Sequence, residues 1–493
     1  MTLTQNRVSN HIDLNGGEYP TTSYVTPSLF GILDTPSFKD AAESFELEVC
    51  KARSAEFKVA GRIAFIRNSK AISFVKIKDE TGILQLICTK VLIDAEMMKH
   101  FDLGDIIEAT GVACKSKAGE HSLLVTGIRL LTKCINPPPE KFAGIADQET
   151  KYRQRYLDLM TDPNSMEVFK TRAKILHHIR LYMVDRNFME VDTGILTPIS
   201  SGANAKPFVT HHEALDQDMY LRIAPELNLK KLLVGGFRKV FEIAKVFRNE
   251  GISAKHSPEF TIMEYYEAYG SFSDLARNTI AMLRHLEWVL PSTERKFTLS
   301  EYAVVTMKDA VLASCKKKDI KLHPDFRMVT HGEENPINIA FASLVNSLES
   351  PGLRIAKLFE EFAEPELEED YRCGMHSIPV FITEHPIETS PLARPSDKDN
   401  AFTDRFELFI CGMEIANAYQ ELNCPFTQEA NFLSQVEKNA ADPMQLDQDY
   451  LEALKYGMPP AIGFGCGIDR LCVLFSNASN IKDVILFPTL KKL

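Results

Sequence analysis

Residues 239–269, KVFEIAKVFRNEGISAKHSPEFTIMEYYEAY, constrain the fold more than any other stretch of this 493-residue chain. Apolar and polar residues alternate over 240–247 and again over 259–266, which is typical of two β-strands. The residues between them, 249–258, are polar and include Gly251, so the pattern predicts a hairpin with a long loop. The period of two gives the second strand one face made up of Phe260, Ile262, Glu264 and Tyr266.

Arg248 and Glu250 follow the first strand at the mouth of this loop. A guanidinium group binds phosphate through a planar fork and keeps its charge, and an exposed aromatic ring can stack on a base. A carboxylate can accept a hydrogen bond from an exocyclic amine or an ammonium group. The hairpin therefore indicates a nucleotide site with an amine-bearing second substrate. Taken alone, it is equally well interpreted as a surface hairpin with ordinary ion pairs.

Three short motifs give a more specific interpretation of the hairpin. FRNEG (247–251), HSPEF (256–260) and MEYYEAY (263–269) together resemble motif 2 of the class II aminoacyl-tRNA synthetases, in the form found in lysyl-tRNA synthetases. The resemblance extends from about Phe45 to the C-terminus. It implies an α+β fold with an N-terminal OB-fold β-barrel and a class II synthetase catalytic domain, in which helices flank an antiparallel sheet. It also implies a homodimer.

Composition limits the possible locations and site types. No apolar run approaches the roughly 20 residues needed to cross a bilayer, and the first 20 residues lack the apolar core of a signal peptide. We therefore expect a cytoplasmic protein with no membrane partner. The ten cysteines are scattered without a Cys-x-x-Cys pair, which indicates buried thiols. The net charge of −11 argues mildly against a nucleic-acid partner, but the basic stretch 51–78 can supply a local binding surface.

Turn residues and strand patterns divide the chain into four parts. With the roles that the resemblance implies, these are an N-terminal extension (1–44), an OB-fold anticodon-binding domain (45–135), a linker (136–154) and the catalytic domain (155–493). The extension has weak periodicity, which predicts only a short helix over 38–44. The OB-fold domain shows five short strands, with a helix over 91–101 after the third. These strands are expected over 57–66, 71–78, 82–88, 106–114 and 122–131.

The second OB strand has one apolar and one mixed face. Val75 and Ile77 face one way, while Phe74 faces the other together with Lys76 and Lys78. An exposed aromatic ring among lysines suits stacking on an unpaired base, although a solvated strand with one stray Phe is about as good an interpretation of the pattern alone. The resemblance implies that the residues reading the lysine anticodon are Arg62, Phe74, Gln85 and Glu120.

The catalytic domain opens with a helix predicted over 168–186 and a strand over 188–193. This unit resembles motif 1, which builds the dimer interface in the family. Further along, the pattern predicts a strand over 219–224, a helix from Pro225 to Gly235, an amphipathic helix over 272–290, and helical segments over 307–315 and 353–362.

A second hairpin is predicted over 406–410 and 412–419, with its turn near Ile410–Cys411. That turn would place Glu407 opposite Glu414, and like charges in this position are destabilising. A divalent cation would reverse the effect, since Mg²⁺ prefers carboxylate oxygen. Without further context, an edge hairpin with solvated glutamates is the preferred interpretation. The resemblance implies that Glu407 and Glu414 coordinate an Mg²⁺ ion bound with ATP.

Strict alternation puts Glu414 on the opposite strand face from Glu421. The resemblance places both in one site, so we expect a bulge or twist between them. Taken alone, Glu226 would be interpreted as an acid complementing a helix dipole. The resemblance instead gives a lysine-binding set, with Glu421 facing the ε-ammonium: Gly202, Glu226, Arg248, Glu264, Tyr266, Asn417, Tyr419 and Glu421.

GFGCGIDRL (463–471) resembles motif 3 and is expected to end a strand and begin a helix over 468–475. The N-terminus of that helix and Arg470 form an anion site. No GxxxxGK[ST] sequence is present, which argues against a P-loop nucleotidase. The resemblance implies that Arg248 and Arg470 are catalytic, and that ATP contacts come from Arg248, Asn249, Glu250, His256, Ser257, Phe260, Glu414, Gly467, Asp469 and Arg470.

The function implied by the resemblance is ATP-dependent activation of L-lysine, followed by transfer to tRNA(Lys). One alternative is a synthetase of the same class for aspartate or asparagine, but Glu226 and Glu421 suit an ammonium group instead. Another is a non-catalytic paralogue that binds tRNA or protein, which the intact Arg248, Glu250 and Arg470 argue against.

Overall fold

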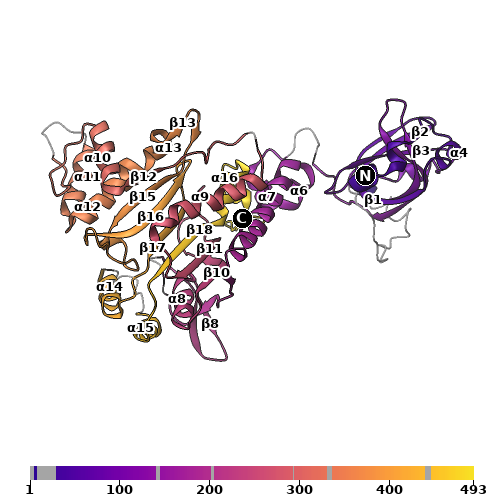
Figure 1. Cartoon of the computed structure of the whole chain (residues 1–493). Helices are drawn as coiled ribbons and strands as arrows, with labels where there is room; N and C mark the ends of the chain where they lie inside the picture. The colour runs from indigo at the N-terminus through magenta and orange to yellow at the C-terminus, as the bar shows by residue number, and fades with distance from the viewer. Residues whose placement is uncertain are drawn as a thin grey trace. The chain divides into compact units, whose positions relative to one another are not determined.

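The computed structural model describes residues 5–7, 29–139, 145–200, 202, 205–292, 294–329, 336–438 and 446–492. The chain forms two compact units, Met1–Ala146 and Asp147–Leu493 (Figure 1). The sequence places a linker through residue 154, whereas helix α5 (Gln148–Arg153) already belongs to the second unit. Within the described ranges, no helix combines the length and the apolar character needed to cross a bilayer.

The first unit contains a closed barrel with the strand order β1-β2-β3-β5-β4, as the OB-fold pattern predicts. Val75 and Ile77 are fully buried in its core, while Phe74 and Lys76 are partly exposed, so the predicted alternation is confirmed. The five predicted strands are present within two residues of their expected ends: β1 (Glu56–Asn68), β2 (Ile72–Lys78), β3 (Ile83–Thr89), β4 (Ile106–Lys115) and β5 (His121–Thr132).

The helix predicted over 91–101 is wrong. Only a short 3₁₀ turn, η1 (Met97–Lys99), forms there. The Asp94 carboxylate accepts a hydrogen bond from the backbone N–H of Glu96 at 2.9 Å, and such a local turn competes with helix formation. Burial of Ile93 and Phe101 holds this segment against the barrel without a helix.

The helix predicted over 38–44 lies earlier in the chain. Two short helices, α2 (Leu29–Leu33) and α3 (Pro36–Lys39), precede α4 (Leu47–Lys51). Pro36 occupies the first turn of α3, where its fixed φ suits a helix start. Leu29 and Phe38 are fully buried in the barrel core, so the last part of the expected extension is packed onto the first unit.

The second unit is built on a sheet that, in the described residues, has eight strands in the order β12-β15-β16-β17-β18-β11-β10-β6 (Figure 1). Neighbouring strands are antiparallel except for the two edge pairs, β12 with β15 and β6 with β10. The predicted antiparallel sheet is thus confirmed. Its strands are β6 (Met189–Glu190), β10 (Lys239–Phe247), β11 (Glu259–Ala268), β12 (Ala303–Thr306), β15 (Val380–Pro386), β16 (Phe402–Ile410), β17 (Met413–Gln420) and β18 (Ala461–Gly467).

Helices α7 (Pro163–Val184), α9 (Phe272–Val289) and α16 (Ile468–Ser476) cover one face of this sheet. Met263, Tyr265 and Phe464 point into that core, where the rings of Tyr265 and Phe464 stack at 4.9 Å. Because side chains alternate along β11, Glu264 and its neighbours face the opposite side. Helices α8 (Glu226–Val234) and α15 (Gln448–Lys455) share a smaller core with Tyr266 there.

Several predicted boundaries move. Helix α7 begins at Pro163, ahead of the predicted 168, because the Asp162 side chain accepts from the N–H of Asn164 and caps it. The strand predicted over 188–193 is reduced to β6, and that predicted over 219–224 is β9 (Gln217–Leu221). The remaining elements are α6 (Arg155–Thr161), β7 (Leu196–Thr197), β8 (Phe208–His212), α10 (Met307–Lys317), α11 (Pro336–Ser347), α12 (Pro351–Leu358), η2 (Phe359–Ala363), η3 (Glu364–Glu366), α13 (Leu367–Asp370), β13 (Arg372–Cys373), β14 (His376–Ser377), η4 (Ile387–Thr389), α14 (Pro425–Lys438) and η5 (Ile481–Val484).

The register of the β16–β17 hairpin differs from the prediction. Its turn lies at Cys411 and Gly412, both with positive φ, as a two-residue hairpin turn of this kind requires. A bulge at Ile415 then offsets the strands, which is the bulge expected between Glu414 and Glu421. The predicted pairing of Glu407 with Glu414 is therefore wrong. The observed pairs are Ile410 with Met413, Phe409 with Glu414, Leu408 with Ala416 and Glu407 with Asn417.

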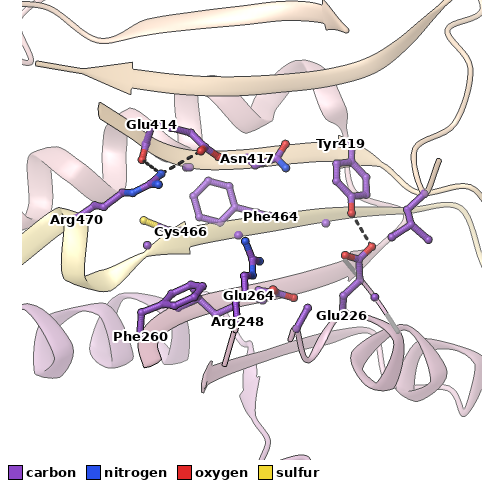
Figure 2. Close-up of a pocket in the computed structure, with 18 of the residues that line it drawn as sticks. Glu226, Arg248, Phe260, Glu264, Glu414, Asn417, Tyr419, Phe464, Cys466 and Arg470 are labelled. Carbon is purple, nitrogen blue, oxygen red and sulfur yellow. Dashed lines mark hydrogen bonds and ion pairs between the residues drawn. The ribbon is translucent and has the colours of Figure 1, made fainter. Parts of the chain in front are cut away.

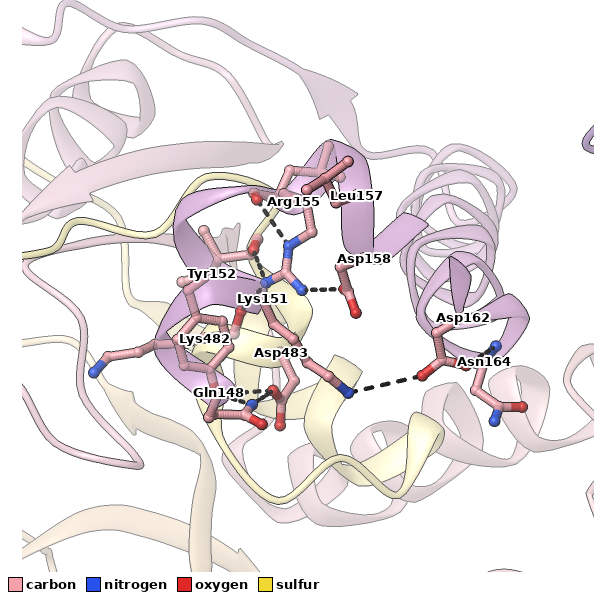
Figure 3. A network of polar contacts seen from close by, with 12 residues as sticks. Gln148, Lys151, Tyr152, Arg155, Leu157, Asp158, Asp162, Asn164, Lys482 and Asp483 are labelled. Carbon is pink, nitrogen blue, oxygen red and sulfur yellow. Dashed lines mark hydrogen bonds and ion pairs between the residues drawn. The ribbon is translucent and has the colours of Figure 1, made fainter. Parts of the chain in front are cut away.

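A buried arginine joins the beginning and the end of the second unit (Figure 3). Arg155 of α6 pairs with Asp158 at 2.8 Å and donates to the backbone carbonyl groups of Lys482, Ile485 and Leu486. Arg155 and Asp158 are only 3% and 1% exposed. Residues 155–158 thus anchor the C-terminal segment beside α7 and α16.

Replacing Arg155 by methionine is expected to lower the stability of the second unit by about 3–5 kcal/mol, because Asp158 is left as an uncompensated buried charge. Thermal and urea melts of the full chain measure the loss. Arg277→Met removes an exposed i,i+3 ion pair with Asp274 and serves as the control, with an expected change of about 0.5 kcal/mol or less. Equal melting of both variants and the parent chain would show that the anchor is dispensable.

Candidate active site

A cavity of about 740 Å³ opens on the sheet face opposite α7, α9 and α16. Strands β11, β17 and β18 form its floor, and the loop after β10 forms one wall. Phe260, Ile262, Glu264 and Tyr266 all line it, as the period-two pattern predicts. Figure 2 shows Arg470 and Phe260 toward one end, the cationic end, and Tyr419 and Glu226 toward the other, the acidic end.

Arg248 lies between the two ends. Its guanidinium group is 5.1 Å from the centre of the Phe260 ring, and its backbone N–H closes the loop onto the carbonyl of Pro258. Burial lowers the pKa of Arg248, although not enough to remove its charge. Its Nε is buried and has no hydrogen-bond partner among the described residues. A buried cation with an unsatisfied donor is suited to receive an anionic ligand.

An internal ion pair lies at the cationic end. Arg470 donates to the Glu414 carboxylate at 3.0 Å and to the Glu414 carbonyl at 2.7 Å (Figure 2). His256 lies beside it, with Nε2 3.4 Å from the guanidinium, and burial together with Arg470 lowers the pKa of His256. A phosphate chain entering here would meet Arg470 and the N–H groups at the start of α16.

Asp469 has a structural role in this unit. One of its oxygens contacts Arg172 of α7, and the other accepts the backbone N–H of Thr261. Asp469 is 2% exposed, and these two contacts connect motifs 2 and 3 to α7. Asn249, also predicted to contact ATP, is not among the residues that line the cavity. The other predicted ATP residues that do line it are Glu250, Ser257 and Gly467.

Most of the residues predicted to bind lysine lie at the acidic end. Tyr419 donates to Glu226 at 2.6 Å, and Tyr266 donates to Glu264 at 3.0 Å. Burial, followed by the nearby Glu226, raises the pKa of Glu264. Asn417 accepts from Arg405 through its side-chain oxygen at 3.1 Å, and Gly202 lines the cavity with a φ of +93°.

Glu421 lies just behind the cavity wall. It is 1% exposed. Its Oε2 pairs with the Nζ of Lys230, whereas its Oε1 has no hydrogen-bond partner among the described residues. A Cβ atom on Gly463, which lines the cavity, would lie only 1.9 Å from Glu421 Oε1. The absence of a side chain at Gly463 therefore makes room for the Glu421 carboxylate directly behind the cavity wall.

The two predicted metal ligands are arranged differently. Glu414 lines the cavity, whereas Glu407 is held at its edge by Arg405 at 2.6 Å. Burial, followed by the charges of Glu407 and Glu414, raises the pKa of Glu364. The three carboxyl groups are therefore close enough to influence one another electrostatically. In the ranges that are described, no group of three or more acidic, His or Cys side chains is spaced for a metal ion. Two carboxylates still fit Mg²⁺, which commonly takes one or two and completes its shell with phosphate and water.

The predicted anticodon residues come together on the barrel. Lys76 pairs with Glu120 at 2.6 Å, and Gln85, opposite Lys76 in the strand register, donates to Ser122 at 2.9 Å. Phe74 lies on the same face of β2 as Lys76. Arg62 lies opposite Lys78 in the register of β1 and β2, and its side chain donates a hydrogen bond to the carbonyl of Gly104.

Three residues that matter for the site carry no clear signal in the sequence. Arg405 orients both Asn417 and Glu407, Gly463 makes room for Glu421, and Lys230 is completely buried between Glu226 and Glu421. Arginines in strands and lysines in helices are common, and Glu421, the second partner of Lys230, lies far away in the chain. Only the spacing of Glu226 and Lys230, one helical turn apart, hints at a pair.

Comparison with known proteins covers nearly the whole chain. The model of the family tRNA synthetases class II (D, K and N) matches residues 147–491, and that of the OB-fold nucleic acid binding domain matches residues 57–131. The lysine–tRNA ligase of Erwinia tasmaniensis is 45% identical over 92% of this chain and 89% of its own length. Those of Salmonella paratyphi C and Pasteurella multocida are 44% and 43% identical, over 92% and 91% of this chain and 89% and 90% of their own lengths. The chain belongs to the class II aminoacyl-tRNA synthetases, in the group of the lysine–tRNA ligases.

Proposed function

We propose that this protein activates L-lysine with ATP and transfers it to tRNA(Lys). The observation that carries the proposal is the pairing of a cationic end and an acidic end within one cavity, with Arg248 between them. ATP fits the first and an amino acid with a cationic side chain fits the second. Lysine-dependent exchange of pyrophosphate into ATP tests the activation step, and charging of tRNA tests the transfer.

In the activation step the lysine carboxylate attacks the α-phosphate of ATP, and pyrophosphate leaves. Arg248 neutralises the charges of both reacting groups and aligns them, which is how most of the acceleration arises in such reactions. Phe260 stacks on the adenine and Glu250 accepts from its amine. Arg470 and His256 hold the outer phosphates, and Ser257 lies beside them. The Arg470–Glu414 pair opens when ATP binds.

Lysine specificity comes from the acidic end. Glu226 and Glu421 receive the ε-ammonium group, while Glu264 and Tyr266 orient the α-amino end. A neutral isostere would leave these buried carboxylates without a partner and would be rejected. Aspartate and asparagine offer no cation to this end, which argues against the related specificities.

Glu407 and Glu414 would hold Mg²⁺ together with ATP. When bound, the ion would neutralise charge on the phosphate chain. The residues of the chain prepare this site in advance, because Arg405 fixes Glu407 and the bulge at Ile415 turns Glu414 toward the cavity.

We also propose that the protein forms a homodimer through α7 and β6. Their outer surface exposes apolar side chains, with Val184 and Met189 55% and 52% exposed and Leu181 43% exposed. Apolar side chains in such a cluster are typical of a protein interface. Sedimentation analysis of the full chain measures the oligomeric state.

Replacing Phe74 by alanine is expected to weaken binding of tRNA(Lys) by about 1–3 kcal/mol, the usual contribution of one aromatic–base stack. The affinity of the full chain for a tRNA(Lys) transcript measures the change. Val91→Ala is the control, because Val91 is a 93% exposed apolar residue of the same unit. If the two variants bound tRNA(Lys) with equal affinity, Phe74 would not be part of the anticodon-binding surface.

A further inference from the structure

A lysine of the chain itself lies beneath the acidic end of the cavity. Lys230 follows Glu226 by one turn of α8, and its Nζ is 2.6 Å from Glu226 Oε1 and in contact with Glu421 Oε2. Its side chain is 0% exposed, and it is not among the residues that line the cavity. A buried ammonium group is costly unless carboxylates pair with it. Lys230 is therefore a built-in part of the acidic end.

Lys230 leaves acceptor atoms for a ligand. Glu226 receives both Lys230 and Tyr419 through the same oxygen, Oε1, so Oε2 remains for the cavity. Oε1 of Glu421 is buried and accepts no hydrogen bond from the described residues, although Gly463 beside it lines the cavity. A buried acceptor without a donor is unfavourable. An ammonium group in the cavity would supply that donor.

The charges at this end are nearly balanced. Three carboxyl groups (Glu226, Glu264 and Glu421) lie near two cations (Lys230 and Arg248), so this end has one net negative charge when all three are ionised. Burial raises the pKa of Glu264 and of Glu421 to about 8, so their ionised forms depend on the cations beside them. Free lysine has two ammonium groups and one carboxylate, and so one net positive charge. Without Lys230 the site would have two net negative charges, and closely spaced buried carboxylates then bind a proton near neutral pH.

We infer that Lys230 is a positioning residue for lysine recognition: an internal counter-ion that favours the ionised forms of Glu226 and Glu421 and brings the charge of the acidic end close to the charge that complements lysine. The inference rests on the proposed function and goes beyond it, because Lys230 does not touch the substrate. Burial acts to lower the pKa of Lys230, but the two glutamates raise it overall, so the cation persists. Burial raises the pKa of Glu421, and Lys230 opposes that rise. The titratable and charged groups around Lys230 are Glu226, Arg248, Glu264, Tyr266, Tyr419, Glu421, Asp447 and Tyr450.

A charge-balance cycle tests the inference with three variants of the full chain, Glu421→Gln, Lys230→Met and the double variant. Lysine-dependent ATP–pyrophosphate exchange gives the KM for lysine of each. Glu421→Gln makes the acidic end neutral and is expected to raise this KM about 100-fold. The double variant restores one net negative charge, so it is expected to recover about tenfold of the loss. Lys231→Met, which removes the neighbouring surface lysine paired with Asp449, is the control and should match the parent chain.

The pH dependence of the KM for lysine distinguishes an electrostatic role of Lys230 from a role in packing alone. In Lys230→Met, one of the two glutamates binds a proton, and lysine must displace it to bind. The KM for lysine should therefore rise about tenfold for each pH unit as the pH falls from about 8.5 to 6.5, through release of one proton. The parent chain and the double variant should show a clearly shallower slope. A structural role for Lys230 would raise KM equally at every pH.

Three results would overturn the inference. One is a Lys230→Met profile parallel to that of the parent chain, and another is a lower KM, which would make Lys230 a competitor of the substrate. The third is a double variant no better than Glu421→Gln, and this comparison decides the matter if Lys230→Met alone fails to fold. Lysine-dependent exchange by the parent chain tests the proposed function separately. A failure of the proposed function can therefore be distinguished from a failure of the inference about Lys230.

Discussion

Replacing Arg248 by alanine is expected to lower kcat/KM for lysine-dependent ATP–pyrophosphate exchange by about 10²- to 10³-fold, as for removal of a preorganised donor at a reacting centre. The buried guanidinium has an unsatisfied Nε and lies against the Phe260 ring, between the cationic and acidic ends. Its loss should reduce the rate at saturating lysine and ATP, since it acts on charge that develops during the reaction. Steady-state exchange measures both parameters.

Two further variants serve as comparisons for Arg248→Ala. Arg248→Lys keeps the positive charge but loses the planar fork, and should fall between the parent chain and Arg248→Ala. Arg238→Ala, at an exposed position just before β10, should leave exchange unchanged. A normal rate in Arg248→Ala would contradict the assigned role, because no other cation of the described residues lies in the same place.

Replacing Gly463 by alanine is expected to raise the KM for lysine about 100-fold or more, since displacement of binding groups by about 1 Å can cost that much. The new methyl group would lie 1.9 Å from Glu421 Oε1 and 2.7 Å from the Tyr266 ring. Neither neighbour can yield easily, because Lys230 holds Glu421 and Tyr266 is buried. Exchange kinetics with varied lysine measure the effect.

Gly194→Ala is the matched control, because a Cβ there meets only the carbonyl of Leu196 at an ordinary 3.5 Å. Its lysine KM should equal that of the parent chain. If Gly463→Ala also binds lysine normally while remaining folded, Glu421 does not contribute to the lysine site. The KM for ATP in the same variant reports whether damage spreads to the cationic end.

The sequence predicts the elements that depend on local pattern. The five barrel strands, the motif 2 hairpin and the face shared by Phe260 and Tyr266 follow from alternation over short distances. The helix expected over 91–101 fails because Asp94 makes a local turn that hydrophobic spacing does not reveal. The family resemblance supplied the roles of the site residues, which periodicity alone left open.

Register and buried partners are harder to predict. A turn displaced by one residue, from Ile410–Cys411 to Cys411–Gly412, changes every pair in the β16–β17 hairpin. The bulge at Ile415 agrees with the expectation from the family resemblance, which places Glu414 and Glu421 in one site. The pairing of Lys230 with Glu421, by contrast, depends on the packing of α8 against the end of β17. Only the three-dimensional structure brings them together.

Amino-acid-dependent ATP–pyrophosphate exchange with Mg²⁺, measured with each of the twenty amino acids in turn, tests the central claim most directly. Exchange with lysine alone, lost in Arg248→Ala, is the expected result. Exchange with aspartate or asparagine would contradict the assignment of the acidic end while leaving the fold intact. Absence of exchange with every amino acid, from folded protein that binds tRNA, would show that the chain is a non-catalytic member of its family.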